Sequence, residues 1–365
     1  MIVNIQLLRG LAALAVAFYH TSYQIPPYGL NTHFNGVAVF FVISGFVMAY
    51  IKKDDSVSFI KNRFARIVPF YWIVSGAMVV LACTGLLNPP YTIPTLFSLA
   101  QNDVWHPFRW LGGNFMAAMT PAEIDLIIKT ALFIPMPMDK GPALGVGWSL
   151  NLEVFYYLSF GLAMAISRKY APLIVAAFLV ALQLLNGLSD NFYWKFYTSY
   201  NNGYFVSGIF LYYVWNWLGS ERILRWRSIA IPVGLAMAAI YVWMHVTYNL
   251  YYLSNPLIPL GLVFSALLLH SANLHCSWRP MIILGEASYS LYLVHLIVLE
   301  AMRPIGAKWP EFNVARELPA AALAVAVSVL LALVLHYAVE KPLVRGVHRL
   351  LDRARKAPEP ALQTN

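Results

Sequence analysis

The chain has 365 residues, of which 60% are hydrophobic and 11% are charged, whereas ordinary soluble domains have about 45–50% and about 25%. This composition excludes a disordered chain, a collagen-like fibre and a water-soluble domain, and it predicts an integral membrane protein. Basic cytoplasmic loops explain the net charge of +9 better than nucleic-acid binding does, so we expect the lipid bilayer, and no nucleic acid, among its partners.

Ten apolar stretches are long enough to cross a membrane as helices. An eleventh stretch, 126–136, is too short to span and is expected to lie re-entrant or flat on the surface. It belongs to the Pro- and Gly-rich segment 88–145, which we expect to be a long periplasmic loop. The predicted fold is an all-α, polytopic membrane helix bundle with about ten transmembrane helices, at 5–24, 34–52, 66–87, 146–167, 171–188, 201–218, 229–247, 252–271, 281–301 and 316–339.

Lys and Arg residues indicate the orientation, because they are enriched in cytoplasmic loops. Ten spans put both termini on one side, and seventeen of the 25 Lys and Arg residues lie on that side against seven on the other. We therefore expect both termini in the cytoplasm. Residues 1–340 would form one transmembrane domain and 341–365 a basic cytoplasmic tail, with 341–356 as an amphipathic helix on the inner leaflet.

Four ionisable side chains fall at membrane depth, namely Arg9, His20, Glu153 and His295. Such a group costs at least about 2.5–3.5 kcal/mol on insertion scales, so each is a functional candidate. Arg9 and His20 are eleven residues apart, close to three helical turns, and share one face of the first helix about 16 Å apart. His20, Glu153 and His295 are expected at one depth, in the outer half of the membrane, on three helices.

Two imidazoles and one carboxylate at one depth are suited to acid–base chemistry. Two other interpretations stay open: each group is a hydrogen-bonding link between buried helices, or the three hold a metal ion. No metal-ligand spacing supports the second, so we predict no metal site. Tyr156 and Tyr292 lie near this set in sequence and are weaker candidates.

Two arginines three residues apart, Arg63 and Arg66, are predicted on one face of a helix at the cytoplasmic side. Their guanidinium groups suit the oxygens of phosphate groups. On composition alone, positive anchoring of a span end on the cytoplasmic side explains them better than phosphate binding does. Ser44 and Gly45 lie within the second predicted span, where Gly45 favours close helix contact.

Five sequence elements resemble the acyltransferase 3 family, the bacterial membrane O-acyltransferases of surface polysaccharides. They occur in order on ten predicted spans and cover nearly the whole chain. The elements are Leu8-Arg9-Gly10 through His20, Phe34-Asn35-Gly36 through Ser44-Gly45-Phe46, Arg63-Phe64-Ala65-Arg66 with Pro69, Tyr71 and Trp72, Trp148-Ser149-Leu150 with Glu153, Phe155 and Tyr156, and Gly285 with Ser288 through Leu293 and His295. The opening is similar to exopolysaccharide and Nod-factor acetyltransferases.

This resemblance implies a transferase that moves an acetyl group, or a longer acyl group, from cytoplasmic acyl-CoA to a carbohydrate hydroxyl on the outer side of the inner membrane. The acceptor would be a polysaccharide or a lipid-linked oligosaccharide. Acetyl-CoA would be the donor substrate, and no cofactor would be bound permanently. The hydrolase-like periplasmic domain that many members carry is absent from this sequence.

On the basis of this resemblance we form a hypothesis for the roles of the candidate residues. Arg63 and Arg66 would bind the CoA phosphates, and Arg9 would orient the pantetheine arm or the thioester. His20 would act as general base or carry the acyl group transiently, and Glu153 would orient it as a triad carboxylate does. His295 would bind the acceptor or donate to the oxyanion. The candidates for lining the acceptor site or the cavity are His295, Tyr292, Tyr156 and Ser44.

Three other functions remain to be distinguished. Intramembrane His and Glu side chains also serve proton-coupled transporters, although the sequence shows no inverted repeat. A second alternative is a non-catalytic component of a polysaccharide export complex, in which the polar residues would link the helices to one another. Another polytopic acyltransferase superfamily also uses an intramembrane histidine, and the arginine elements argue against it.

Overall fold

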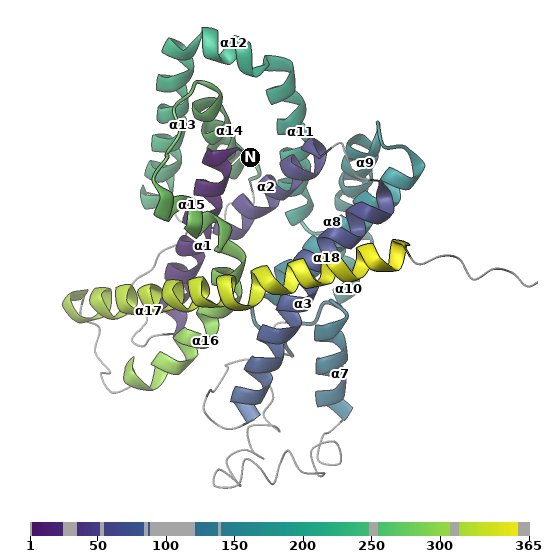
Figure 1. The fold of residues 1–365 in the computed structure, drawn as a ribbon, viewed down its shortest axis with the longest axis vertical. Helices are drawn as coiled ribbons and strands as arrows, with labels where there is room; N and C mark the ends of the chain where they lie inside the picture. The colour runs from purple at the N-terminus through teal and green to yellow at the C-terminus, as the bar shows by residue number, and fades with distance from the viewer. Residues whose placement is uncertain are drawn as a thin grey trace, which may run out of the picture.

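The computed structural model describes residues 2–24, 35–51, 55–83, 87, 121–137, 140–247, 255–306 and 314–356, and within these ranges the chain forms helices and no strands (Figure 1). The predicted all-α fold is therefore confirmed. The elements are α1 Val3–Gln24, α2 Gly36–Tyr50, α3 Ser56–Cys83, α7 Pro121–Ala131, α8 Gly147–Ile166, α9 Ala171–Leu184, η2 Asn186–Leu188, α10 Phe192–Tyr197, α11 Asn201–Leu218, α12 Ser220–Arg225, α13 Arg227–Thr247, α14 Leu257–Ser271, α15 Arg279–Glu286, α16 Ser288–Gly306, α17 Val314–Leu335, η4 His336–Glu340 and α18 Lys341–Lys356.

A helix occupies each of the ten stretches that were expected to span, but the lengths differ. Six described helices are long and apolar enough to cross a membrane, and a seventh crossing results if the bent pair α15–α16 counts as one span. The helices α2 and α14 have only 15 residues each, or about 22 Å at 1.5 Å per residue, which is shorter than a hydrocarbon core of about 30 Å.

The short helix α2 lies inside the bundle, where ten of its residues are buried. It packs closely against α11 at two glycines, Gly45 and Gly208. A Cβ atom at Gly45 would collide with the carbonyl oxygen of Phe205, and one at Gly208 with that of Val42. The two backbones are thus in direct contact, as small residues permit between membrane helices.

The helix α3 begins at Ser56, ten residues before the span expected at 66–87. Asp55 stabilises this start: its Oδ1 accepts a hydrogen bond from the Ser58 backbone N–H at 2.9 Å, and its Oδ2 accepts one from the Ser58 hydroxyl at 2.8 Å. These two bonds, the backbone one first, lower the pKa of the Asp55 carboxyl. The extension places Arg63 and Arg66 on a continuous helix.

The pair α15–α16 bends by 74° between Glu286 and Ser288. The bend lies directly against α1, because a Cβ atom at Gly285 would collide with the carbonyl oxygen of Gln6, and one at Gly10 would lie 3.0 Å from the Gly285 nitrogen. The beginning of α1 and the bend therefore fix each other's position.

The helices α17 and α18 join through the π-helix η4, and Leu318–Leu351 forms one continuous helix (Figure 1, yellow-green to yellow). The tail expected from residue 341 thus continues the last predicted span directly, and α18 packs against α3. The short stretch expected at 126–136 forms the end of α7 and a turn, which lie against α3: the Trp72 indole N–H donates to the Ala131 carbonyl oxygen at 2.9 Å. Of the expected loop 88–145, residues 88–120, 138 and 139 lie outside the described residues.

Candidate active site

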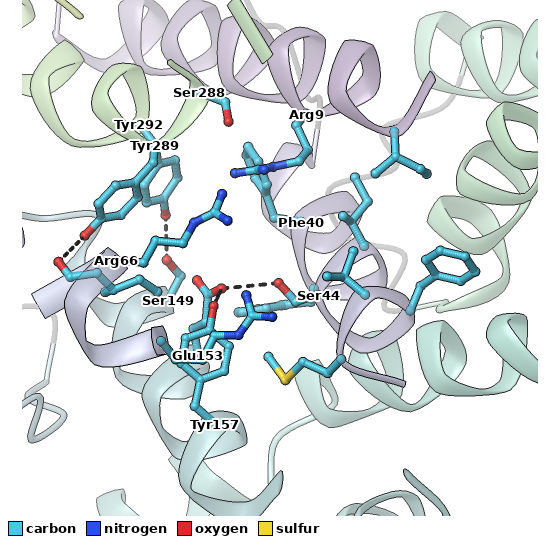
Figure 2. A pocket seen from close by; sticks show the side chains of 18 of the residues that line it. Arg9, Phe40, Ser44, Arg66, Ser149, Glu153, Tyr157, Ser288, Tyr289 and Tyr292 are labelled. Atoms are coloured by element: carbon cyan, nitrogen blue, oxygen red, sulfur yellow. Dashed lines mark hydrogen bonds between the residues drawn. The ribbon is translucent and has the colours of Figure 1, made fainter. Parts of the chain in front are cut away.

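A cavity of about 320 Å³ lies inside the bundle among α1, α2, α3, α8 and α16 (Figure 2). Most of its apolar wall comes from α2. Its polar wall combines charged, amide and hydroxyl-bearing side chains from five helices, namely Gln6, Arg9, Ser44, Tyr50, Arg63, Arg66, Ser149, Glu153, Tyr157, Ser288, Tyr289 and Tyr292.

Three guanidinium groups and one carboxylate line this cavity, which leaves two positive charges in excess. Arg9 and Arg66 point into the same space from α1 and α3 (Figure 2). Arg9 donates a hydrogen bond to Oε1 of Gln6 at 3.0 Å, and the Arg63 guanidinium lies 5.4 Å from the centre of the Phe59 ring. Among the described residues, no carboxylate oxygen lies within 4.0 Å of these three groups. Uncompensated positive charge at this depth is costly, and an anionic ligand would relieve it.

Glu153 belongs to the same cavity, on α8 (Figure 2). Its Oε1 accepts hydrogen bonds from the hydroxyl of Ser44 at 3.2 Å and from the hydroxyl of Tyr157 one turn later on α8. These contacts hold the carboxylate in the arginine cavity, so the structure does not pair it with His20 as the triad hypothesis required.

One end of the cavity lies at helix ends, and the other lies deep in the bundle. Ile2 precedes α1, and Tyr50 ends α2 with 48% of its surface exposed. Phe40 lies ten residues before Tyr50 on α2, or about 15 Å away. Its ring packs on that of Tyr292 with centres 5.9 Å apart. The Tyr292 hydroxyl lies 2.6 Å from Oγ of Ser149, which fixes the tyrosine at the deep end.

Two histidines meet directly behind Tyr292. The ring of His295, which is completely buried, lies 6.1 Å from the ring of Tyr292. On its other side, Nε2 of His295 lies 3.2 Å from Nδ1 of His20. Neither histidine is among the residues that line the cavity. The structure therefore joins His20 and His295 as a pair beside Tyr292, a residue of the cavity wall.

The hydrogen bonds of this pair define its tautomers. His20 Nδ1 lies 2.9 Å from the carbonyl oxygen of Val16, and His295 Nδ1 lies 3.0 Å from that of Leu291. A carbonyl oxygen only accepts, so Nδ1 carries the hydrogen in both neutral rings. Nε2 of His295 is then an acceptor, and it shares the single Nδ1–H of His20 with the carbonyl oxygen of Val16. Of the two histidines, His20 therefore keeps an unprotonated Nε2 atom whose lone pair is free. A general base requires such a free lone pair.

The sequence-based candidates thus separate into three places. Arg9, Ser44, Arg63, Arg66, Glu153 and Tyr292 line the cavity, and His20 and His295 form the pair behind it. Tyr156 faces another direction: its hydroxyl donates to Oδ1 of Asn202 at 3.1 Å, and its ring stacks on Phe205 at 4.4 Å. Adjacent residues differ by about 100° around a helix, so Tyr157 faces the cavity and Tyr156 faces α11.

Sequence reasoning missed six polar cavity residues, namely Gln6, Tyr50, Ser149, Tyr157, Ser288 and Tyr289. Tyr157 follows Glu153 by four residues, and that spacing predicts a shared face. Ser149, Ser288 and Tyr289 lie within the two elements that carried the family resemblance, where no role had been assigned to them. Within the described part of the chain, no three His, Cys, Asp or Glu side chains gather in a way that could hold a metal ion.

The fold and this site define a class: a multi-pass, all-helical membrane protein with an arginine-lined internal cavity and a buried histidine pair. The sequence profile of the acyltransferase domain that defines the acyltransferase 3 family matches residues 2–337. The chain belongs to this family and is an acyltransferase.

Curated relatives agree with this assignment. The chain is similar to the exopolysaccharide production protein ExoZ of Rhizobium meliloti (28% identity over 74% of this chain and 78% of ExoZ). It is also similar to the acyltransferase MdmB of Streptomyces mycarofaciens (28%, covering 89% and 84%) and to the peptidoglycan O-acetyltransferase OatA of Listeria monocytogenes (21%, covering 82% of this chain and 49% of OatA). No solved structure matches the chain.

Proposed function

We propose that the protein transfers an acetyl group, or another acyl group, from cytoplasmic acyl-CoA to a carbohydrate hydroxyl on the outer side of the bacterial inner membrane. The family assignment and the names of ExoZ and OatA support carbohydrate O-acylation. The observation that carries the proposal is the cavity itself, where three arginines and one carboxylate face one internal space.

The arginine cavity is the proposed site for the acyl-CoA donor. CoA carries several phosphate groups, and guanidinium groups bind phosphate oxygens in bidentate geometry. The cavity begins at the start of α1 and the end of α2, the helix ends that the distribution of Lys and Arg places in the cytoplasm. The pantetheine arm would extend past Arg9 toward Phe40 and Tyr292.

The histidine pair is the proposed site of transfer. His20 Nε2 would take the proton of the acceptor hydroxyl, and the acceptor oxygen would attack the thioester carbonyl carbon. The carbon–sulfur bond then breaks, and the CoA thiolate leaves and is protonated from the His20 imidazolium. His295, through its contact with Nδ1 of His20, would hold the reacting ring in the required tautomer.

Glu153 has a different role in this account from that of a triad carboxylate. It would balance part of the positive charge of the arginines when no ligand is bound, and it would hold Ser44 and Tyr157 in the wall. A full complement of ten transmembrane helices, with both termini in the cytoplasm, belongs to the same proposal. It counts the bent pair α15–α16 as one span and the shorter helices α2, α11 and α14 as spans.

The test uses purified protein in lipid nanodiscs with acetyl-CoA and a panel of oligosaccharide acceptors. Release of CoA thiol and acetylation of the sugar are followed together. We expect both in the wild type, with His20→Ala losing both while retaining the same helical content and folded yield. If the wild type transfers no acyl group from any of several acyl-CoA donors, the proposal is wrong, and transport or assembly functions would be tested next.

A further inference from the structure

A second group of buried polar side chains lies outside the cavity, at the join of η4 and α18. Oε2 of Glu340 accepts a hydrogen bond from the Ser290 hydroxyl at 2.5 Å and lies 2.7 Å from Nδ1 of His336. All three side chains are buried. Nε2 of His336 is buried without a partner in the described structure, so the hydrogen of the neutral ring belongs on Nδ1 and is donated to Glu340. One carboxylate oxygen thus receives two hydrogen bonds.

The next residue along the chain makes a second contact in the same region. Nζ of Lys341 lies 3.0 Å from Oε2 of Glu286, the last residue of α15. Ser290 lies in the first turn of α16. The consecutive residues Glu340 and Lys341 therefore hold the two sides of the 74° bend between α15 and α16. The π-helical turn of η4 places His336 and Glu340 together at this point, and such turns are frequent at functional sites.

The bend that these contacts hold also builds the site. Ser288, Tyr289 and Tyr292 follow it on α16 and line the cavity, and His295 follows one turn later. The Tyr289 hydroxyl donates to the carbonyl oxygen of Ile67 at 2.7 Å, next to Arg66 on α3. A shift of the bend would move the cavity wall and the histidine pair together.

We propose that Glu340 is a positioning residue of the transferase, which fixes the α15–α16 bend through Ser290 and thereby sets the geometry of the donor cavity and of the histidine pair. The proposal rests on the function proposed above. Glu340 does not line the cavity, so its effect on turnover would act through α16. A hydrogen-bonded carboxylate can fix the bend better than an apolar contact can. Glu340 accepts from both of its donors only when the helices have one particular arrangement.

The experiment compares Glu340→Ala and Glu340→Gln in nanodiscs, with Glu221→Ala as a matched control on the exposed face of α12. The amide oxygen of glutamine can take the place of Oε2, whereas alanine removes the acceptor. Hydrogen exchange of residues 279–302 reports on the bend, and kcat and KM for acyl-CoA are measured on equal amounts of folded protein. We expect Glu340→Ala to exchange faster there and to lose kcat/KM at least about tenfold, because a displacement of about 1 Å costs on the order of 10²-fold. Glu340→Gln should remain within about threefold of the wild type.

Each other outcome overturns the proposal. Unchanged exchange in Glu340→Ala means that Glu340 does not hold the bend. Faster exchange with wild-type kcat and KM means that it is a structural link without influence on the site. Equal losses in Glu340→Gln and Glu340→Ala would show that the hydrogen-bond acceptor is not what matters. A wild type without acyl-CoA turnover refutes the proposed function instead, and hydrogen exchange still decides whether Glu340 holds the bend.

Discussion

The Nε2 atom of His295 lies 3.2 Å from the Nδ1 atom of His20, although the two residues are 275 positions apart in the sequence. This contact joins α16 to α1 behind the arginine-lined cavity. In the proposed mechanism Nε2 of His20 is the base of the pair, and His295 takes the orienting position that a carboxylate occupies in a serine hydrolase triad.

The histidine pair predicts unequal losses. His20→Ala should lower kcat by about 10²–10⁴-fold, the usual contribution of a general base. His295→Ala should lower kcat by roughly 10–10²-fold, because it removes orientation and leaves the base. His295→Gln, whose amide oxygen can accept from Nδ1–H of His20, should recover part of that loss. Steady-state kinetics on acetyl-CoA measure all three. A larger loss in His295→Ala than in His20→Ala would contradict this assignment of roles.

The arginines predict a defect in donor binding. Hydrogen bonds to charged groups contribute about 1.5–3 kcal/mol, so Arg63→Ala or Arg66→Ala should raise KM for acyl-CoA by about 10–100-fold, with kcat little changed. Lysine at either position should restore only part of the affinity for acyl-CoA, because it lacks the guanidinium fork. The exposed Arg222→Ala on α12 is the matched control.

A truncated donor locates the contact. If the arginines bind the phosphates of CoA, acetyl-pantetheine should be a poor substrate for the wild type and an equally poor one for Arg63→Ala. A variant whose KM rises by the same factor for acetyl-pantetheine as for acetyl-CoA would place the arginines elsewhere on the donor.

The aromatic contact between Phe40 and Tyr292 predicts donor selectivity. Both rings line the cavity, and that of Tyr292 lies beside His295, so in the proposed mechanism an acyl group that reaches His20 passes them. Phe40→Ala should raise the ratio of octanoyl to acetyl transfer by at least about tenfold, since each buried methylene contributes about 0.8 kcal/mol. Competition between the two acyl-CoA donors measures the ratio. An unchanged ratio would show that the acyl group does not pass between these rings.

The close contact of α2 and α11 predicts a large effect of a single methyl group. Gly45→Ala should lower the thermal stability of the protein and its folded yield, because the new Cβ atom meets backbone of α11 and overpacking costs about 1–3 kcal/mol. Gly76→Ala on α3 is the control, since a methyl group added there would meet no neighbouring atom within 4 Å. Fluorescence-detected melting in detergent compares them. Equal melting temperatures for Gly45→Ala and the wild type would mean that the helices separate readily.

Much of the fold was predictable because helix position depends on local composition. Each of the ten predicted spans contains a helix. The number of full-length crossings was not predictable, since burial and not length keeps the 15-residue α2 inside the bundle. The bend between Glu286 and Ser288 was also missed: it depends on the fit of Gly285 against α1, and that fit requires the partner helix.

The sequence predicted at which depth in the membrane the site residues lie, but not the direction in which each side chain points. Counting residues along helices placed His20 and His295 at one level, and the structure brings them together. The same counting placed Glu153 there, but its carboxylate faces Ser44 and Tyr157. Which way a side chain points depends on the rotation of each helix in the bundle, and a single sequence does not contain that rotation. For the same reason the sequence predicted Tyr156 as a cavity residue, whereas the structure places Tyr157 in the cavity wall.

The most direct test of the account asks from which side each substrate enters. Sealed vesicles of either orientation, carrying the wild type or His20→Ala, receive labelled acetyl-CoA, which does not cross the membrane, and an impermeant oligosaccharide acceptor on the opposite face. We expect acetylated sugar only in wild-type vesicles that receive acetyl-CoA on the face where the arginine cavity begins. Transfer only when donor and acceptor share one face, or equal transfer by His20→Ala, would contradict it.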